Sequence, residues 1–192
     1  AGQLIWNGHV KVTECGWSNG LTMSRTATPC GFLAAQETVY LWQNQFNADI
    51  FDAAITYGVP ARLLKRMMML ESQFWPFYSG PAGEIGIMQI TDNGLDTLLR
   101  FDPDLDPVYL GRSEIQKAWA RNAARQEFLC HNCNLQEALD HIRETMPAYA
   151  RLLAAFHCRA VILNPAHEGA DQWRQTVVDF NGSGTYLLKV ER

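Results

Sequence analysis

One run of sequence decides the fold, VPARLLKRMMMLESQF over residues 59–74. Pro60 suits the first turn of a helix, because its missing N–H and its fixed φ cost nothing there. Leu64, Met67 and Glu71 then lie one turn apart on a single helical stripe. Basic residues occupy the opposite side. We therefore expect an amphipathic helix that buries this stripe.

Glu71 stands on the apolar stripe near the helix end, where a purely structural sequence would place a leucine. Partial loss of water disfavours the carboxylate and raises the pKa of a carboxyl group. A carboxylic acid that is still protonated near neutral pH is what cleavage of a glycosidic bond needs as its general acid. The alternative is a structural Glu that pairs with a nearby Arg at a helix end.

A loop rich in turn residues follows, SGPAGEIGIMQIT over residues 79–91. Gly83 and Gly86 permit positive φ or close approach of the backbone, which a loop lining a cleft requires. Met88 and Gln89 place a soft apolar side chain beside an amide, and this combination suits an amidosugar. The loop therefore favours a sugar-binding site next to Glu71.

Two short motifs, Glu71-Ser72 and GIMQI over residues 86–90, resemble the paired motifs of the lytic transglycosylases related to goose-type lysozyme. A third family element is an Ala-Tyr-Asn-x-Gly segment, and here residues 179–184 read DFNGSG. In many members a tyrosine follows shortly, and Tyr186 is the candidate. The resemblance covers roughly residues 55 to 190, with the motifs in the family order.

The resemblance implies an all-α, lysozyme-like helical domain that cleaves the β-1,4 bond between N-acetylmuramic acid and N-acetylglucosamine in peptidoglycan. It implies that Glu71 first donates a proton to the glycosidic oxygen and then removes the proton of the C6 hydroxyl, which leaves a 1,6-anhydromuramic end. The second carboxylate of standard glycosidases is not needed in this scheme. The residues that the resemblance assigns to substrate binding are Ser72, Gly86, Met88, Gln89, Phe180, Asn181 and Tyr186.

Phe180 departs from the family pattern, because it stands where the family has tyrosine. We expect Tyr186 to supply the missing hydroxyl, since it follows two glycines that leave the backbone room to turn inward. Two other functions stay open. One is a goose-type-lysozyme-like hydrolase that uses water, with Glu84 or Asp92 as base. The other is a non-catalytic peptidoglycan-binding module that kept the cleft.

The composition is that of one globular domain, or of one domain with an N-terminal extension. The 192 residues are 47% hydrophobic and 19% charged, which excludes wholesale disorder. A net charge of −4 without a basic stripe argues against nucleic acid as a partner. No window approaches the roughly 18 unbroken apolar residues of a membrane span. Peptidoglycan glycan strands are the partner that we expect.

Five cysteines point to an oxidising compartment, so we place the protein outside the cytoplasm, as a periplasmic, secreted or cell-wall-associated protein. Cys15 and Cys30 bracket a loop and are expected to pair. Residues 130–133 read CHNC and resemble half of a zinc site, but Cys158 and its neighbour are not at standard spacing. We favour a disulfide from Cys158 to Cys130 or Cys133, and no metal or cofactor. An odd count leaves one thiol unpaired or bonded to another chain.

We expect an N-terminal arm and first helix over residues 1–54 and a catalytic domain over residues 55–192. Residues 1–31 lack a helical period, which predicts an irregular or hairpin-like arm. Apolar residues recur at helical spacing over residues 32–57. Further helices are predicted after Thr91 and after a capping box at Ser113, with a turn-rich connection over residues 102–111 between them. A long helical pattern covers residues 134–163, with a break near Pro147. The last two helices are predicted over residues 169–180 and after Gly184.

Overall fold

The computed structural model of the protein describes residues 1–78, 80–81, 83–102 and 108–192. In this part of the chain the regular structure is helical, and strand pairing is limited to two isolated antiparallel bridges. The predicted all-α class is therefore confirmed. Most of the connection predicted over residues 102–111 lies outside the described residues, as do Ser79 and Ala82 of the loop.

The chain forms two compact units, residues 1–46 and residues 47–192. The boundary lies before Asn47, whereas the sequence analysis placed it between residues 54 and 55. The first unit consists of α1 (Gly2–Trp6), η1 (Thr13–Ser18) and α2 (Pro29–Asn44). The sequence predicted an irregular or hairpin-like arm here, and the structure has short helical segments in its place. The bridge between Leu21 and Ala27 is the hairpin-like feature of this unit.

Two features hold the first unit together. Helix α1 packs against α2 and buries Leu4 and Ile5, and this burial explains why a short segment without strong periodicity is helical. The predicted disulfide between Cys15 and Cys30 joins η1 to the first turn of α2. Thr28 caps α2, because its hydroxyl accepts a hydrogen bond from the backbone N–H of Gly31.

The single helix predicted over residues 32–57 is wrong, because α2 ends at Asn44 and α3 (Asn47–Tyr57) begins after a two-residue break. The amide side chains at the break bind backbone carbonyl groups of the preceding turn. Asn44 Nδ2 donates to the carbonyl of Tyr40 at 2.7 Å, and Gln45 Nε2 donates to that of Trp42 at 3.1 Å. These bonds satisfy carbonyl groups at a helix end and so favour termination there.

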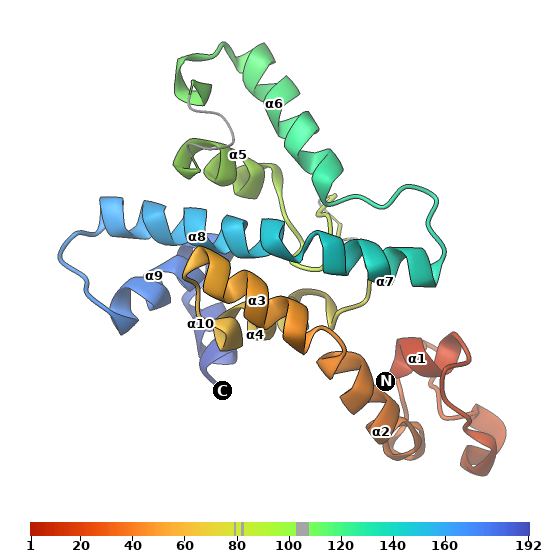
Figure 1. Ribbon diagram of the computed structural model, residues 1–192. Coiled ribbons are helices and arrows are strands. Elements are labelled where there is room, and N and C mark those ends of the chain that lie inside the picture. The colour runs from red at the N-terminus through yellow and green to blue at the C-terminus, as the bar shows by residue number, and fades with distance from the viewer. Residues whose placement is uncertain (79, 82, 103–107) are drawn as a thin grey trace. The chain divides into compact units, whose positions relative to one another are not determined.

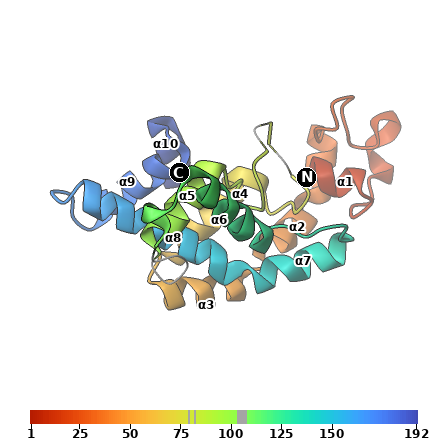
Figure 2. The same ribbon diagram turned by 90° about the horizontal axis from the view of Figure 1, so that it is seen from above.

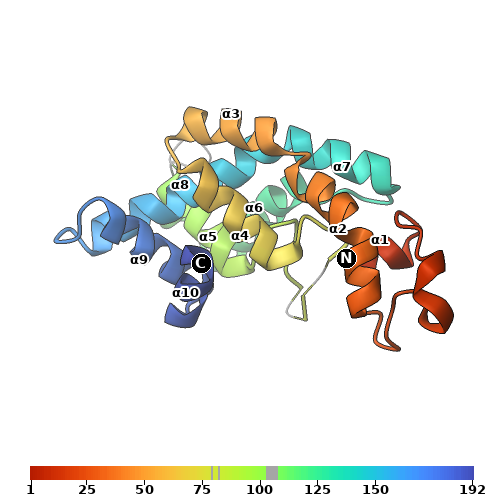
Figure 3. The same cartoon turned by 90° about the horizontal axis from the view of Figure 1, so that it is seen from below.

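Helix α8 (Met146–Leu163) is the centre of the second unit. It crosses the middle of this unit in Figure 1, and the views from above and below show the other helices of the unit around it (Figures 2 and 3). Contacts join it to α3, α4, α5, α7 and α9. The remaining elements are α4 (Ala61–Ser72), α5 (Asp92–Phe101), η2 (Tyr109–Gly111), α6 (Glu114–Glu127), α7 (Leu135–Glu144), α9 (Ala170–Asn181) and α10 (Gly184–Glu191).

Most of the predicted helix starts in this unit are confirmed. The Thr91 hydroxyl caps α5, and Ser113 and Gln116 form a complete capping box at the start of α6. The break predicted near Pro147 separates α7 from α8, and this proline occupies the first turn of α8. Helices α9 and α10 lie where the last two helices were expected.

The disulfide predicted for Cys158 is wrong. Cys130 bonds to Cys133, and Cys158 is an exposed free thiol on α8. Asn132, between the paired cysteines, adopts a left-handed conformation with φ of 56°. This tight turn brings the two Cα atoms to 5.7 Å, a spacing that a disulfide spans. Among the described residues, no group of three or more His, Cys, Asp or Glu side chains could hold a metal ion.

Within the described ranges, no helix combines the length and the apolar character that crossing a bilayer demands.

The two disulfides should differ in their effect on stability. Replacing Cys15 and Cys30 together by Ser should lower the free energy of unfolding by about 3 kcal/mol, because the bond closes a loop with a sequence separation of 15. The same change at Cys130 and Cys133, separated by 3, should lower it by roughly 2 kcal/mol or less. Denaturant unfolding of the oxidised proteins measures both. A larger loss at the second pair would contradict this account.

Candidate active site

Glu71 lies in the last turn of α4, on the face that the helix turns toward the core. Leu64 and Met67 on the same stripe are both 0% exposed, whereas Glu71 is half-buried. The apolar stripe expected from the sequence is thus buried, and its burial ends at the Glu71 side chain. The Glu71 side chain therefore combines an apolar surrounding with partial access to solvent, and a general acid requires both.

The chain reverses immediately after Glu71. Gln73 and Phe74 both adopt left-handed conformations, with φ of 54° and 60°, and Gln73 N–H donates to the carbonyl of Met69 at 3.1 Å. A left-handed conformation costs a non-glycine residue about 1 kcal/mol or more. Phe74 is completely buried, and burial of a phenylalanine contributes about 2–3 kcal/mol. Packing of this ring offsets the strain and leaves Glu71 at an abrupt helix end.

The surroundings of Glu71 raise the pKa of its carboxyl group. Burial is the largest cause, and the side chains of Tyr186 and Asn181 oppose it by interacting with the carboxylate. The negative charge of Glu84 adds a further rise. Glu71 Oε1 and the Tyr186 hydroxyl are both shielded from water, and neither has a hydrogen-bond partner of ordinary length and angle in the described part of the chain. Their interaction is thus weaker than a formed hydrogen bond, and burial dominates.

Tyr186 reaches Glu71 from α10. Its side chain is 7% exposed, and burial together with the charge of Glu71 raises the pKa of its hydroxyl, which therefore stays a donor at neutral pH. Arg66 fastens α10 to α4, because Nη2 donates to the carbonyl of Lys189 at 3.0 Å and Nε donates to it at 3.3 Å. This carbonyl belongs to the last turn of α10, where intrahelical partners are lacking. The sequence placed Arg66 only on a polar helix face.

The loop after α4 closes into a tight hairpin. Ile85 and Ile90 exchange two backbone hydrogen bonds, at 3.1 and 2.8 Å. The Ser72 hydroxyl, on a side chain that is 6% exposed, donates to the carbonyl of Ile87 at 2.8 Å. The resemblance assigned Ser72 to substrate binding. In the structure its buried hydroxyl holds the loop against the end of α4, directly beside Glu71.

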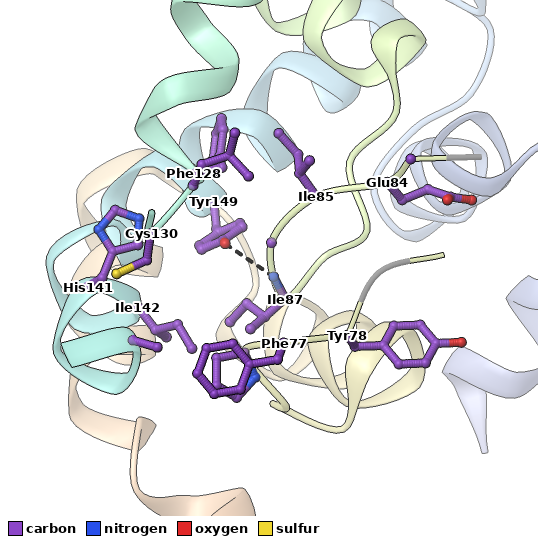
Figure 4. A pocket seen from close by; sticks show the side chains of 15 residues that line it. Phe77, Tyr78, Glu84, Ile85, Ile87, Phe128, Cys130, His141, Ile142 and Tyr149 are labelled. Carbon is purple, nitrogen blue, oxygen red and sulfur yellow. Dashed lines mark hydrogen bonds between the residues drawn. The ribbon is translucent and has the colours of Figure 1, made fainter. Parts of the chain in front are cut away.

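Tyr149 of α8 supports the same loop from the other side. Its hydroxyl accepts a hydrogen bond from the N–H of Ile87 at 3.1 Å (Figure 4). Gly86 has a φ of 65°, and a Cβ atom there would collide with the Tyr149 hydroxyl. Burial raises the pKa of Tyr149, so the group stays neutral. Sequence reasoning missed this residue, because a tyrosine within an apolar helical pattern has the signature of an ordinary core residue.

Gln89 and Met88 lie inside the loop. Gln89 has a φ of 50°, and its Nε2 donates to the carbonyls of Tyr78 and Gly86 at 3.0 and 2.9 Å, so the amide joins the two halves of the loop. Met88 is 0% exposed. The sequence predicted that Met88 contacts an amidosugar, and the structure places its side chain in the core beneath the loop.

The third motif contributes two residues with different surroundings. Asn181, the last residue of α9, is exposed and interacts with the Glu71 carboxyl. Phe180 packs edge-on against Phe156 of α8, with ring centroids 5.2 Å apart. The structure thus brings Glu71, Asn181 and Tyr186 together, whereas the Phe180 ring supports α9. Ser72, Gly86, Met88 and Gln89 form the supporting loop.

A cavity of about 400 Å³ lies on one side of the loop, between it and α7 and α8 (Figure 4). Phe77 and Tyr78 line it and are about half exposed, so both rings offer apolar surface of the kind on which sugars stack. Sequence reasoning did not single out either residue. The Glu84 carboxylate points away from the centre of this cavity in Figure 4.

Alanine substitutions at two loop glycines should distinguish the cost of backbone strain from the cost of a steric clash. Gly83 and Gly86 both have positive φ, 75° and 65°, but a Cβ atom at Gly83 would enter open space whereas one at Gly86 would strike the Tyr149 hydroxyl. Gly83→Ala should lower the free energy of unfolding by about 1 kcal/mol through strain alone. Gly86→Ala should cost at least about 1 kcal/mol more. Thermal unfolding compares them, and equal losses would show that the contact with Tyr149 is unimportant.

The raised pKa of Glu71 predicts how stability depends on pH. The pKa of the Glu71 carboxyl group is higher in the folded state than in the unfolded state, where it has the ordinary value of 4.5. Ionisation of Glu71 therefore lowers the stability of the fold progressively as pH rises above 4.5 and through the folded pKa. Glu71→Gln should therefore match the parent protein below pH 4.5 and become the more stable of the two as pH rises toward neutrality. Melting curves of both proteins from pH 4 to 8 test this, and an unchanging difference would contradict it.

Residues 49–105 match a family model, that of the transglycosylase SLT domain. The matched segment contains Glu71-Ser72 and the loop through Gln89, and it ends before Asn181 and Tyr186. Comparisons with curated proteins and with solved structures returned no significant match. The matched domain supports lytic transglycosylase activity on peptidoglycan. Residues 49–105 are therefore similar to the transglycosylase SLT domain, in agreement with the resemblance to lytic transglycosylases that the motifs carry.

Proposed function

We propose that this protein cleaves the β-1,4 bond between N-acetylmuramic acid and N-acetylglucosamine in peptidoglycan and leaves 1,6-anhydromuramic ends. Glu71 is the acid and then the base. The observation that carries the proposal is the half-buried Glu71 carboxyl group, which keeps a raised pKa although Tyr186 and Asn181 interact with it. The SLT domain match over residues 49–105 supports the substrate class.

The proposed reaction needs one carboxyl group in two protonation states. Protonated Glu71 donates to the glycosidic oxygen as the bond to the anomeric carbon breaks, and the departing sugar leaves with that proton as an alcohol. The C6 hydroxyl of the muramic residue forms the new bond to the anomeric carbon. Its proton passes to the Glu71 carboxylate, which restores the acid. Protons and electron pairs balance without a cofactor or an external nucleophile.

Tyr186 and Asn181 support this cycle by opposing the effect of burial on the protonation equilibrium of Glu71. Burial favours the acid form of Glu71, whereas the Tyr186 hydroxyl and the Asn181 side chain favour the carboxylate. A group that must both donate and accept a proton works best when neither form is far more stable than the other. Tyr186 therefore takes the part of the hydroxyl that Phe180 lacks, and Asn181 is also placed to hold the acetamido group of the sugar.

A hydrolase that uses water is the second candidate, and Glu84 favours it. Its negative charge reaches Glu71 and raises the pKa of that carboxyl group, so a second acid lies near the first. Asp92, the other residue considered as a base, pairs with Arg125 at 2.6 Å and its side chain is 72% exposed. If water is activated at this site, Glu84 rather than Asp92 is the base that we propose.

The site of action follows from the substrate. SLT domain proteins act on peptidoglycan, which lies outside the cytoplasmic membrane, and the two disulfides suit an oxidising environment. We therefore propose a periplasmic, secreted or cell-wall-associated protein.

Glu71→Gln should lower turnover of purified sacculi by at least about a hundredfold, the usual contribution of a general acid and base. Mass spectrometry of the products from the parent protein should find 1,6-anhydromuramic ends. Glu84→Gln is the matched control and should retain activity if the C6 hydroxyl is the nucleophile. Reducing ends, together with inactivity of Glu84→Gln, would establish the hydrolase instead. Binding of sacculi without any turnover would establish a non-catalytic module.

A further inference from the structure

A second cavity of the larger unit begins at the proposed site and holds charges that the proposed reaction does not use. It has a volume of about 710 Å³, enough for a short peptide, and lies between α5, α8 and α9. Asn181, which interacts with Glu71, forms part of its wall. Its charged lining consists of Asp96, Arg100, Arg159 and Asp179.

Two of these charges neutralise each other. Arg100 Nε lies 2.5 Å from Asp96 Oδ2, and Asp96 also accepts a hydrogen bond from the hydroxyl of Tyr109 at 2.6 Å. Arg121 lies 3.4 Å from the other oxygen of this carboxylate. This network connects α5, η2 and α6 and accounts for Asp96 and Arg100 as structural residues.

The other two charges are left without an ionic partner. Arg159, half-buried on α8, forms no ion pair or hydrogen bond with any described residue. Asp179 on α9 accepts a hydrogen bond from Gln175 Nε2 at 2.7 Å, and no cation of the described chain pairs with it. A partly buried charge without a counter-charge loses hydration that nothing in the protein restores. The cavity therefore presents one guanidinium group and one carboxylate to whatever enters it.

We propose that this cavity binds the peptide branch of a peptidoglycan muramic residue, with a peptide carboxylate on Arg159 and the side-chain ammonium group of a diamino acid on Asp179. The inference rests on the proposed function, which supplies a glycan that carries such branches. An anion alone would be repelled by Asp179, and a cation alone by Arg159, whereas a zwitterionic peptide satisfies both. The cavity starts at Asn181, so the branch leaves the reacting sugar beside Glu71.

The proposal makes Arg159 and Asp179 specificity residues for peptide-bearing strands. Arg159 presents a planar donor group, which suits bidentate binding of a carboxylate. Asp179 sits two residues before Asn181 on the same helix, α9. Recognition of the branch and placement of the sugar at Glu71 thus depend on one element, and binding of the peptide positions the glycan for cleavage.

Calorimetry on Glu71→Gln protein tests this without turnover. The probes are a GlcNAc–MurNAc disaccharide with a tetrapeptide that contains a free diamino-acid amine, the same compound with that amine acetylated, and the disaccharide without peptide. Arg159→Gln and Asp179→Asn should each weaken binding of the first probe by about tenfold or more. Neither should alter binding of the peptide-free disaccharide. Asp179→Asn should not weaken binding of the acetylated probe. Arg174→Gln is the control, because Arg174 already pairs with Asp171 and Glu191.

Equal affinity of parent and variants for the first probe would overturn the inference. So would an equal loss with the peptide-free disaccharide, because it would place the effect on the sugar. If Arg159→Gln does not fold, Arg159→Lys takes its place, because it keeps the charge. Arg159→Lys should lower the affinity for the first probe by a smaller factor, and an unchanged affinity would again overturn the inference. Turnover of sacculi by the parent protein is measured separately. Its absence would refute the proposed function and leave the peptide-binding result to be judged on its own.

Discussion

The structure around the proposed site depends on one constraint, a carboxyl group on the apolar face of α4. Burial of Glu71 raises its pKa, and the fold supplies interactions that limit the rise without removing it. Tyr186 and Asn181 come from α10 and α9, more than a hundred residues later in the chain. The position of these two helices therefore determines whether Glu71 is an acid that can also become a base.

Three side chains from different elements fix the backbone around Glu71. Ser72 holds the loop to α4, Tyr149 holds it to the central helix α8, and Arg66 fastens α10 to α4. None of these three side chains needs to touch a substrate. Their hydrogen bonds fix backbone atoms, and fixed backbone is what keeps a catalytic geometry within a fraction of an ångström. We attribute the unusual left-handed conformations after Glu71 to this requirement.

The sequence alone indicated the parts that depend on local patterns. The helix carrying Glu71, the caps at Thr91 and Ser113 and the break near Pro147 follow from residue periodicity and capping chemistry, which act within a few residues. The break between α2 and α3 was missed, because amide side chains terminate a helix only when they turn back onto the backbone. Tyr149 and Arg159 were missed because their roles depend on contacts between distant segments. The pairing of Cys130 with Cys133 depends on a turn conformation that residue counts do not reveal.

A nuclear magnetic resonance titration of the Glu71 carboxyl carbon tests the central claim most directly. The account predicts a pKa above the ordinary value of 4.5, a higher pKa in Tyr186→Phe, where an opposing interaction is lost, and a lower pKa in Glu84→Gln, where a repelling charge is lost. Opposite shifts in these two variants would show that burial, Tyr186 and Glu84 act on the carboxyl group as the structure indicates. A pKa at or below 4.5 in the parent protein, unaffected by either substitution, would contradict the account.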